Sequence, residues 1–275
     1  MSAYLGSTKI WDSSSTPSPA EWVRPADWLA MPTIAPTEEK LVGLHCVWPT
    51  DGNFCAFTIS GAFTVDWGDG VVENFASGAT AYHEYDYDDV DLAGTESTRG
   101  YKQVLVTITP QSGKNLTSVN FHVKHNQAGL LSGYSSGWLD IMFSAPSCTN
   151  LIIGGTTSRH SMFERFTGLS CGLLTSMSYM FNNCYSLASL DLSSFDTSAV
   201  TSISMFSSCY SLASLLFPCD KTFTVASCKL SAAALDELYT SLPTVTGKTI
   251  TVTGNYGTSG HTPSIATAKS WTVTF

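Results

Sequence analysis

A 25-residue unit that occurs twice in succession constrains the fold of this chain more than any other feature. The first copy contains Met180-Phe-Asn-Asn-Cys-Tyr-Ser-Leu-Ala-Ser-Leu190 and the second contains Met205-Phe-Ser-Ser-Cys-Tyr-Ser-Leu-Ala-Ser-Leu215, so nine of eleven paired positions are identical. A fixed period of this length is typical of a solenoid, in which each coil buries its apolar face against the next. The repeat therefore predicts a short stack of coils.

The repeat also predicts which side chains are buried and which are free to bind. We expect Leu187, Leu190 and Leu192 to point inward from a short strand, with Phe181 and Cys184 filling the convex side. Binding then falls to the outward positions, which are Tyr185, Ser189, Asp191, Tyr210 and Ser214.

Charge and composition exclude several classes of protein. The chain has 22 acidic and 13 basic residues, a formal net charge of -9 and no Lys/Arg cluster, which argues against a nucleic-acid partner. Only 13% of residues are charged, which favours a mainly β architecture. No stretch approaches the roughly 20 apolar residues of a membrane span, and the start lacks a basic region followed by an apolar run. We therefore expect no membrane insertion and no secretion by a signal peptide.

The eight cysteines follow no CxxC or Cys/His metal spacing. Cys184 and Cys209 occupy the same phase of the two copies. We interpret them as buried thiols in a reduced compartment, since free cysteine behaves as a small apolar side chain. A disulfide between them is the alternative.

The chain divides into four expected regions. Residues 1–37 form an N-terminal strand and a Pro/Trp-rich anchoring arm, 38–125 a β-sandwich, 126–229 the repeat solenoid with degenerate first coils, and 230–275 a C-terminal α/β cap. In the cap, residues 230–242 predict a helix with Ser231 as N-cap and Pro243 as its stop. Strands are expected at 248–253 and 271–275, with a short helical segment at 263–269 between them.

The arm carries the candidate anchor residues. Apolar side chains in residues 1–12 predict a short strand or hairpin that pairs with its own chain or a neighbour's. Two tryptophans in a Pro-rich segment are costly to leave in water, so they are expected to dock either on the chain's own next region or on another subunit. The anchor candidates are Tyr4, Leu5, Ile10, Trp11, Trp22 and Trp28.

Alternating apolar residues in 41–48, 54–59, 63–67, 101–109 and 118–123 predict an antiparallel sandwich. In Val65-Asp-Trp-Gly-Asp-Gly70, the glycines allow positive φ and Asp69 can cap the turn. Together with His83-Glu-Tyr85 and Gly100-Tyr-Lys-Gln-Val-Leu-Val106, this turn resembles the polycystic-kidney-disease-type (PKD) sandwich. Such sandwiches serve as spacers and binding modules alike.

Candidate sites for chemistry are few. Asp86, Asp88, Asp89 and Asp91 offer oxygen ligands but lack the Gly and distal Glu of an EF-hand loop, so a solvated loop is favoured over a Ca²⁺ site. His122 and His125 are a possible metal pair. No HExxH occurs, and the turn explains Asp66 and Asp69. We therefore predict no catalytic, cofactor or metal residues and no enzyme.

Two longer resemblances extend this interpretation. The stretch Met180 to Thr201 resembles the bacterial-surface-antigen (BspA-like) leucine-rich repeats, whose consensus it follows almost residue by residue. The second copy departs from that consensus after Leu215. The sequences Tyr4-Leu-Gly-Ser-Thr-Lys9, Arg24-Pro-Ala-Asp-Trp-Leu29, Ser231-Ala-Ala-Ala-Leu-Asp-Glu-Leu238 and Ala268-Lys-Ser-Trp-Thr-Val-Thr274, taken with both modules, resemble tailed-bacteriophage virion proteins of the fibre, appendage or decoration type.

The resemblance implies a non-enzymatic virion structural protein that assembles in the bacterial host cytoplasm. Its partners would be tail, neck, portal or capsid subunits, copies of itself in a homo-oligomer, and a host surface glycan or protein. A bacterial surface adhesin and a tail-associated glycan depolymerase are the alternatives. If residues 1–37 are the anchor, deleting them is expected to prevent incorporation and leave the remainder folded.

Overall fold

A computed structural model describes residues 22–50, 53–124, 135–155, 160–172, 174–201 and 203–275, and the backbone of two N-terminal strands. The protein is mainly β, with 32% strand and 9% helix. Among the described residues, no helix is long and apolar enough to cross a membrane. The N-terminal strands, β1 (Ser2–Leu5) and β2 (Thr8–Asp12), pair antiparallel, which confirms the predicted hairpin.

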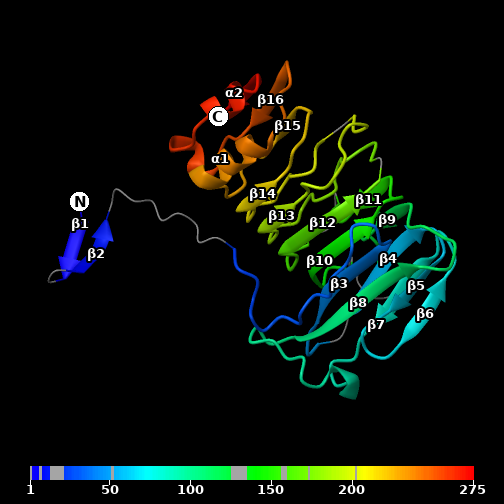
Figure 1. Cartoon of the computed structure of the whole chain (residues 1–275). Coiled ribbons are helices and arrows are strands. Elements are labelled where there is room, and N and C mark those ends of the chain that lie inside the picture. The colour runs from blue at the N-terminus through cyan, green and yellow to red at the C-terminus, as the bar shows by residue number, and fades with distance from the viewer. Residues whose placement is uncertain are drawn as a thin grey trace.

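One eight-stranded sheet runs through most of the molecule (Figure 1). Its order is β14 (Ser214–Leu216), β13 (Ser189–Asp191), β12 (Arg165–Cys171), β10 (Trp138–Ala145), β3 (Lys40–Val47), β8 (Lys102–Pro110), β5 (Phe63–Asp66) and β6 (Val72–Phe75). A second sheet has the order β11 (Asn150–Ile152), β9 (Ser118–Asn120), β4 (Phe54–Ser60) and β7 (Thr80–Glu84).

The eight-stranded sheet changes from antiparallel to parallel at β10. Strand β10 pairs antiparallel with β3 on one side and parallel with β12 on the other, after which β13 and β14 continue in parallel. The second sheet changes in the same way, because β11 joins β9 in parallel. Both sheets and the main hydrophobic core therefore continue across the boundary expected at residues 125 and 126.

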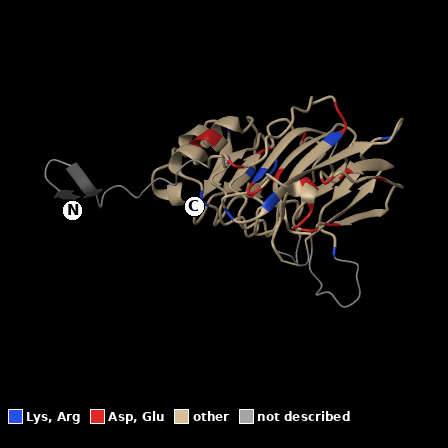
Figure 2. Cartoon of the chain, turned by 90° about the horizontal axis from the view of Figure 1, so that it is seen from below, with Lys and Arg blue, Asp and Glu red and all other residues tan. Residues whose placement is uncertain are grey.

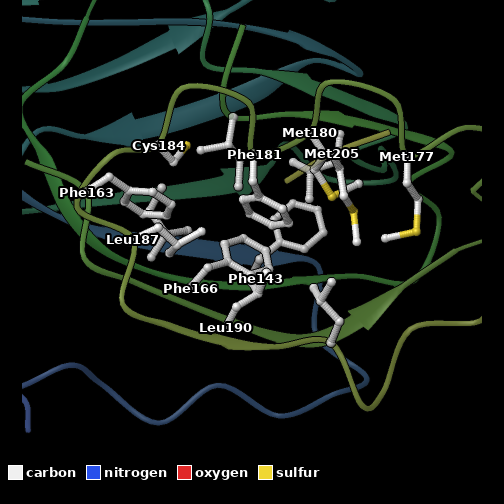
Figure 3. Packing of buried hydrophobic residues seen from close by; sticks show 14 of the residues in the cluster. Phe143, Phe163, Phe166, Met177, Met180, Phe181, Cys184, Leu187, Leu190 and Met205 are labelled. Carbon is white, nitrogen blue, oxygen red and sulfur yellow. The ribbon is translucent and has the colours of Figure 1, made fainter. Parts of the chain in front are cut away.

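The repeat copies lie side by side in the parallel half of the sheet. Ser189 pairs with Ser214 and Leu190 with Leu215, so the 25-residue period of the sequence is the register of β13 on β14. The predicted inward residues are buried: Leu187, Leu190, Leu192, Phe181 and Cys184 are at most 1% exposed. Figure 3 shows how Phe181, Leu187 and Leu190 pack among aromatic residues of β10 and β12, including Phe143 and Phe166. This dense apolar interior stabilises coils that have only short strands.

All eight cysteines are buried free thiols. Burial raises the pKa of Cys228 to about 12, and it raises the pKa of the Cys184 and Cys209 thiols as well. The Cys209 thiol lies 3.2 Å from the Phe181 carbonyl oxygen of the preceding copy. Cysteine at this phase thus acts as a small apolar residue between coils, and these protonated thiols are poor nucleophiles.

The C-terminal region forms its own three-stranded parallel sheet of β15 (Phe223–Thr224), β16 (Lys248–Thr251) and β17 (Trp271–Thr274). Helix α1 (Ala232–Ser241) begins after Ser231, whose side chain accepts a hydrogen bond from the Ala234 amide, and it ends before Pro243, as predicted. It packs against β14. The short helices η2 (Tyr256–Ser259) and α2 (Ser264–Thr267) precede β17.

The Trp-Gly-Asp-Gly turn after β5 is held by the contacts that its residues suggest. Gly68 and Gly70 have φ of 84° and 87°, and the Asp69 carboxylate accepts from the Val71 amide at 3.1 Å. The second Asp69 oxygen lies 2.5 Å from His83 Nε2. The ring of His83 stacks on Trp67 at 4.9 Å. The turn and the His83 motif are therefore one packed corner, and Asp69 is occupied as a turn residue, whereas Tyr101 of the third motif lies in a separate hydrophobic cluster with Trp28.

Substituting Gly68 by alanine is expected to destabilise the protein by roughly 2–3 kcal/mol, because left-handed backbone strains a side chain and the new Cβ has no room. That Cβ would lie 2.7 Å from the Leu105 carbonyl oxygen. Gly78 is the matched control, with φ of 78° and nothing within 4 Å of the place that a Cβ would occupy. Urea unfolding of both variants measures the difference. Equal losses for Gly68→Ala and Gly78→Ala would contradict the close approach.

In the expected sandwich region, two strands were missed by the sequence analysis, and one segment is shorter than expected. Strands β6 and β7 were not predicted, because β6 has an exposed, polar composition without apolar alternation. His83 lies near the end of β7. Strand β9 covers only Ser118–Asn120 of the predicted 118–123. The short η1 helix (Val90–Leu92) includes Asp91, the last residue of the acidic run.

Candidate functional site

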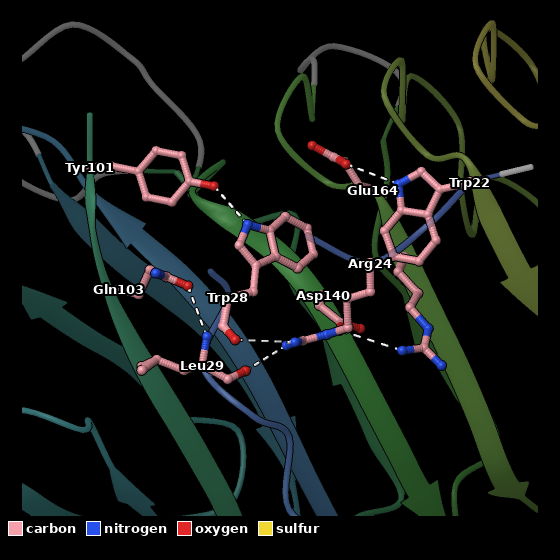
Figure 4. A network of polar contacts seen from close by, with 9 residues as sticks. Trp22, Arg24, Trp28, Leu29, Tyr101, Gln103, Asp140 and Glu164 are labelled. Carbon is pink, nitrogen blue, oxygen red and sulfur yellow. Dashed lines mark hydrogen bonds and ion pairs between the residues drawn. The ribbon is translucent and has the colours of Figure 1, made fainter. Parts of the chain in front are cut away.

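The arm residues from Trp22 onward pack on the outer face of the eight-stranded sheet (Figure 4). Trp28 is 4% exposed and joins Leu44, Cys46, Tyr101 and Leu139 in a second hydrophobic cluster. Its Nε1 donates to the Tyr101 hydroxyl at 2.9 Å. The structure therefore adopts the first of the two expected alternatives, in which the arm docks on its own chain.

Trp22 and the charged residues around it extend this docking toward β12. Its Nε1 donates to the Glu164 carboxylate at 3.0 Å, and the Arg165 guanidinium lies 6.0 Å from its ring centroid. Arg99 forms an ion pair with the same Glu164 and also lies over the Trp28 ring. Such cation–π contacts add to the burial of the rings.

A buried ion pair fixes the arm at its centre. Asp140 on β10 is fully buried, and one of its carboxylate oxygens accepts from Arg24 Nε at 2.8 Å. The same guanidinium donates to the Trp28 and Leu29 carbonyl oxygens, at 3.3 and 2.6 Å. Burial raises the pKa of the Asp140 carboxyl, an effect that Arg24 and Arg165 oppose. Arg24 thus ties the arm backbone to the sheet and neutralises a buried charge.

These contacts correct the assignment of Trp28 as an anchor for another subunit, because its ring and its N–H are both used within the chain. Trp22 is half-buried and likewise engaged. The side chains of Tyr4, Leu5, Ile10 and Trp11 lie outside the described residues, so the anchor prediction for them stays a prediction. Residues 22–37 are therefore part of the folded body and not a separate linker.

The outward positions of the repeat form a second candidate surface. Ser189 and Asp191 on β13, and Ser214 on β14, are half-buried, and the register pairs Arg165 with Ser189 and Ser189 with Ser214. The structure thus places the three β13 and β14 positions together on one sheet face. The Asp191 carboxylate is turned to its own backbone, where it accepts from the Ser193 amide at 2.9 Å.

The two repeat tyrosines lie in the turn before each strand. Tyr185 and Tyr210 have ring centroids 5.4 Å apart, and Tyr210 is 50% exposed. An open hollow of about 300 Å³ lies beside Tyr210. It is lined by Tyr210, by other residues of the second copy and by residues at the end of β15 and just after it. Tyr210 therefore lies at the rim of this hollow, with Tyr185 beside it. Neither tyrosine lies on the strands that carry Ser189 and Ser214.

The other candidate residues have local structural roles. The Asp86 and Asp89 carboxylates accept from the Asp88 and Asp91 amides at 2.9 and 3.0 Å, which favours the solvated-loop interpretation. His122 lies 6.3 Å from the ring of His160, while His125 is outside the described residues. Within the described part of the chain, no three His, Cys, Asp or Glu side chains gather as a metal site would require.

The sequence analysis missed the residues that lock the arm, namely Arg24, Gln103, Asp140 and Glu164. Gln103 is 1% exposed, accepts from the Leu29 amide at 3.1 Å and donates to the Asp27 carbonyl at 2.9 Å. The available signal was Asp140 itself, a lone charge inside the apolar run Trp138 to Phe143 that predicts a buried partner. Its partner lies 116 residues away, so no local pattern identifies Arg24.

Comparison with known proteins gives no match: no family model, no curated protein and no solved structure matches the chain. We therefore infer its function from its own residues and their geometry.

Proposed function

We propose that this chain is a non-enzymatic structural protein of a tailed-bacteriophage particle, an appendage or fibre of the tail, neck, portal or capsid. In this proposal a PKD-like sandwich and BspA-like repeats form one rigid body, residues 1–21 attach it to another virion protein, and the repeat end meets a host surface. The assignment to a phage rests on the sequence resemblance. The geometry supports the stiffness of the body and the docking of the arm on it.

The observation that carries the proposal is the continuous eight-stranded sheet. A joint between separate domains allows relative motion by default, because few contacts cross a linker. Here β10 hydrogen-bonds to β3 on one side and β12 on the other, and the core is shared. A spacer that projects from a particle needs such stiffness, and this sheet supplies it over the described residues.

The docked arm supports the same role. Because Arg24 and Trp28 clamp the arm to the sheet, the attachment segment before Trp22 joins directly to the rigid body. A homo-oligomer in the particle would form through the same N-terminal hairpin.

A shortened chain of residues 22–275 tests the proposed attachment. It keeps the arm contacts, so we expect its urea unfolding midpoint to match that of the full chain within error. Incorporation into particles, measured by immunoblot after density-gradient purification, is expected to fall at least tenfold. Incorporation at the full-length level would contradict an attachment role for residues 1–21.

A chain of residues 38–275 is the informative contrast. It also removes Trp28 and Arg24, which exposes the Tyr101 cluster and leaves Asp140 without its closest cation. We expect it to be destabilised, so deletion of residues 1–37 changes stability and attachment together. Only the cut at residue 21 separates attachment from stability.

A further inference from the structure

The hollow beside Tyr210 is a feature that the attachment role does not use. Met205 and Phe206, which are 1% and 3% exposed, form its floor. Its walls carry hydroxyl groups, and Tyr210 stands half-exposed at its rim. The hydroxyl-bearing wall residues are Ser204, Ser207, Ser208, Thr224 and Ser227.

The two repeat copies explain why the hollow exists at this place. The second copy has Ser204 where the first has Tyr179, and Ser207 and Ser208 where the first has Asn182 and Asn183. Tyr179 and Ser204 lie on neighbouring coils, since the Tyr179 amide donates to the Ser204 carbonyl at 2.9 Å. Smaller side chains in the second copy therefore leave space between it and the C-terminal region.

The ring of Tyr210 is braced as a platform. Its hydroxyl lies 3.3 Å from the Ser208 hydroxyl, and its ring lies beside that of Tyr185. A half-exposed aromatic ring held on two sides offers an apolar face with little loss of conformational entropy on binding. Ser204 and Ser207 are exposed next to it, with no hydrogen bond from either hydroxyl to another described residue. Their hydroxyls can serve a ligand as donors and acceptors.

Charge narrows the class of ligand. None of the residues lining the hollow is charged, and no Lys or Arg occurs between Arg165 and Lys221. In Figure 2, which colours Lys and Arg blue and Asp and Glu red, most of the described chain carries neither colour. An anionic or cationic ligand would lose hydration here without a compensating partner. The volume of about 300 Å³ is at the small end of ligand pockets, which span about 300–1,000 Å³.

We propose that this hollow binds one neutral sugar unit of a surface glycan, with the sugar ring against Tyr210 and its hydroxyls on the serine side chains. A sugar ring combines an apolar face with hydroxyl edges, and the hollow combines an apolar floor and rim with hydroxyl walls. The host origin of the glycan rests on the proposed function, whereas the binding itself does not.

Ligand-observed NMR with the purified full-length protein tests the binding. The probes are lactose, maltose, cellobiose and N,N′-diacetylchitobiose, with N-acetylneuraminic acid as the anionic comparison. We expect saturable binding of at least one neutral disaccharide and none of the anionic sugar. Tyr210→Ala is expected to weaken binding about tenfold. Ser204→Tyr, which restores the larger residue of the first copy, is expected to abolish it by filling the hollow.

Tyr256→Ala is the matched control, because Tyr256 is 59% exposed and is not among the residues lining the hollow. It should bind as the unaltered protein does, and the unfolding midpoints of all three variants should show that they are folded. The proposal is overturned if no neutral probe binds, if the anionic sugar binds more tightly, or if both hollow variants bind normally. Because this assay uses protein outside any particle, its failure leaves the particle assignment standing, and the reverse also holds.

Discussion

Replacing Arg24 by methionine is expected to lower the free energy of unfolding by roughly 3 kcal/mol, as is usual when one partner of a buried ion pair is removed. Asp140 is fully buried, and its other cation, Arg165, lies 3.9 Å away at a partly exposed position. One Asp140 oxygen already has no hydrogen-bond partner among the described residues. The variant therefore leaves a carboxylate that is both desolvated and poorly paired. Urea unfolding at pH 7 measures the loss.

The double variant Arg24→Met/Asp140→Asn separates the ion pair from the packing of the arm. Because the unpaired charge is gone, it should recover at least half of the single-variant loss. Arg99→Met is the surface control: its ion pair with Glu164 is 43% exposed on the Arg99 side, so its charge pairing should contribute less than about 1 kcal/mol. Additive losses in the double variant would show that Arg24 does not act through Asp140.

The pH dependence of the Arg24→Met loss follows from the raised pKa of Asp140. A carboxyl whose pKa is higher in the folded state binds more protons there, so stability falls as pH rises from the ordinary Asp value through the raised one. Without Arg24 that pKa rises further. We expect the Arg24→Met loss to be smaller at pH 4 than at pH 7.

Two buried histidines are expected to make stability fall steeply below pH 6.5. Burial lowers the pKa of His45 to about 3 and that of His160 to about 4, and neither ring has a hydrogen-bond partner among the described residues. The unfolded chain binds protons near pH 6.5 while the folded chain does not. Stability is therefore full above pH 6.5 and is lost toward pH 4, by about 1.4 kcal/mol per pH unit for each histidine.

His45→Leu and His160→Leu measured by urea unfolding between pH 6.5 and pH 4.5 test this slope. Each variant should reduce the slope by one proton relative to the unaltered protein, whatever it does to stability at pH 7. Contributions from other groups are common to all three proteins and cancel in the difference. If the three slopes coincide, the histidines do not titrate between the folded and unfolded states as their burial requires.

The sequence predicted what local patterns encode. The repeat predicted the register of β13 on β14. Ser231 and Pro243 predicted where α1 begins and ends, and the glycines of the turn predicted its positive φ values. Each of these depends on residues within a few positions, or on two copies of one motif. They could be predicted because the physical cause lies in the same stretch of chain.

What the sequence could not predict depends on contacts between distant segments. The continuous sheet arises where β10 pairs with β3, roughly a hundred residues earlier, and no local signal distinguishes that pairing from two separate domains. The docking of the arm could not be predicted for the same reason, because it depends on the contact of Arg24 with the distant Asp140. The second copy has Ser204 at the position of Tyr179 in the first copy, and this difference in size is a sequence signal for the hollow. The size of the hollow, however, depends on where the C-terminal region packs.

Mass spectrometry of density-purified particles of the phage to which the proposal assigns this chain tests the proposed function most directly. We predict that peptides of the chain remain at a constant ratio to the major capsid protein through successive gradients. If the full-length chain is abundant in the lysate and absent from the purified particles, it is not a virion structural protein.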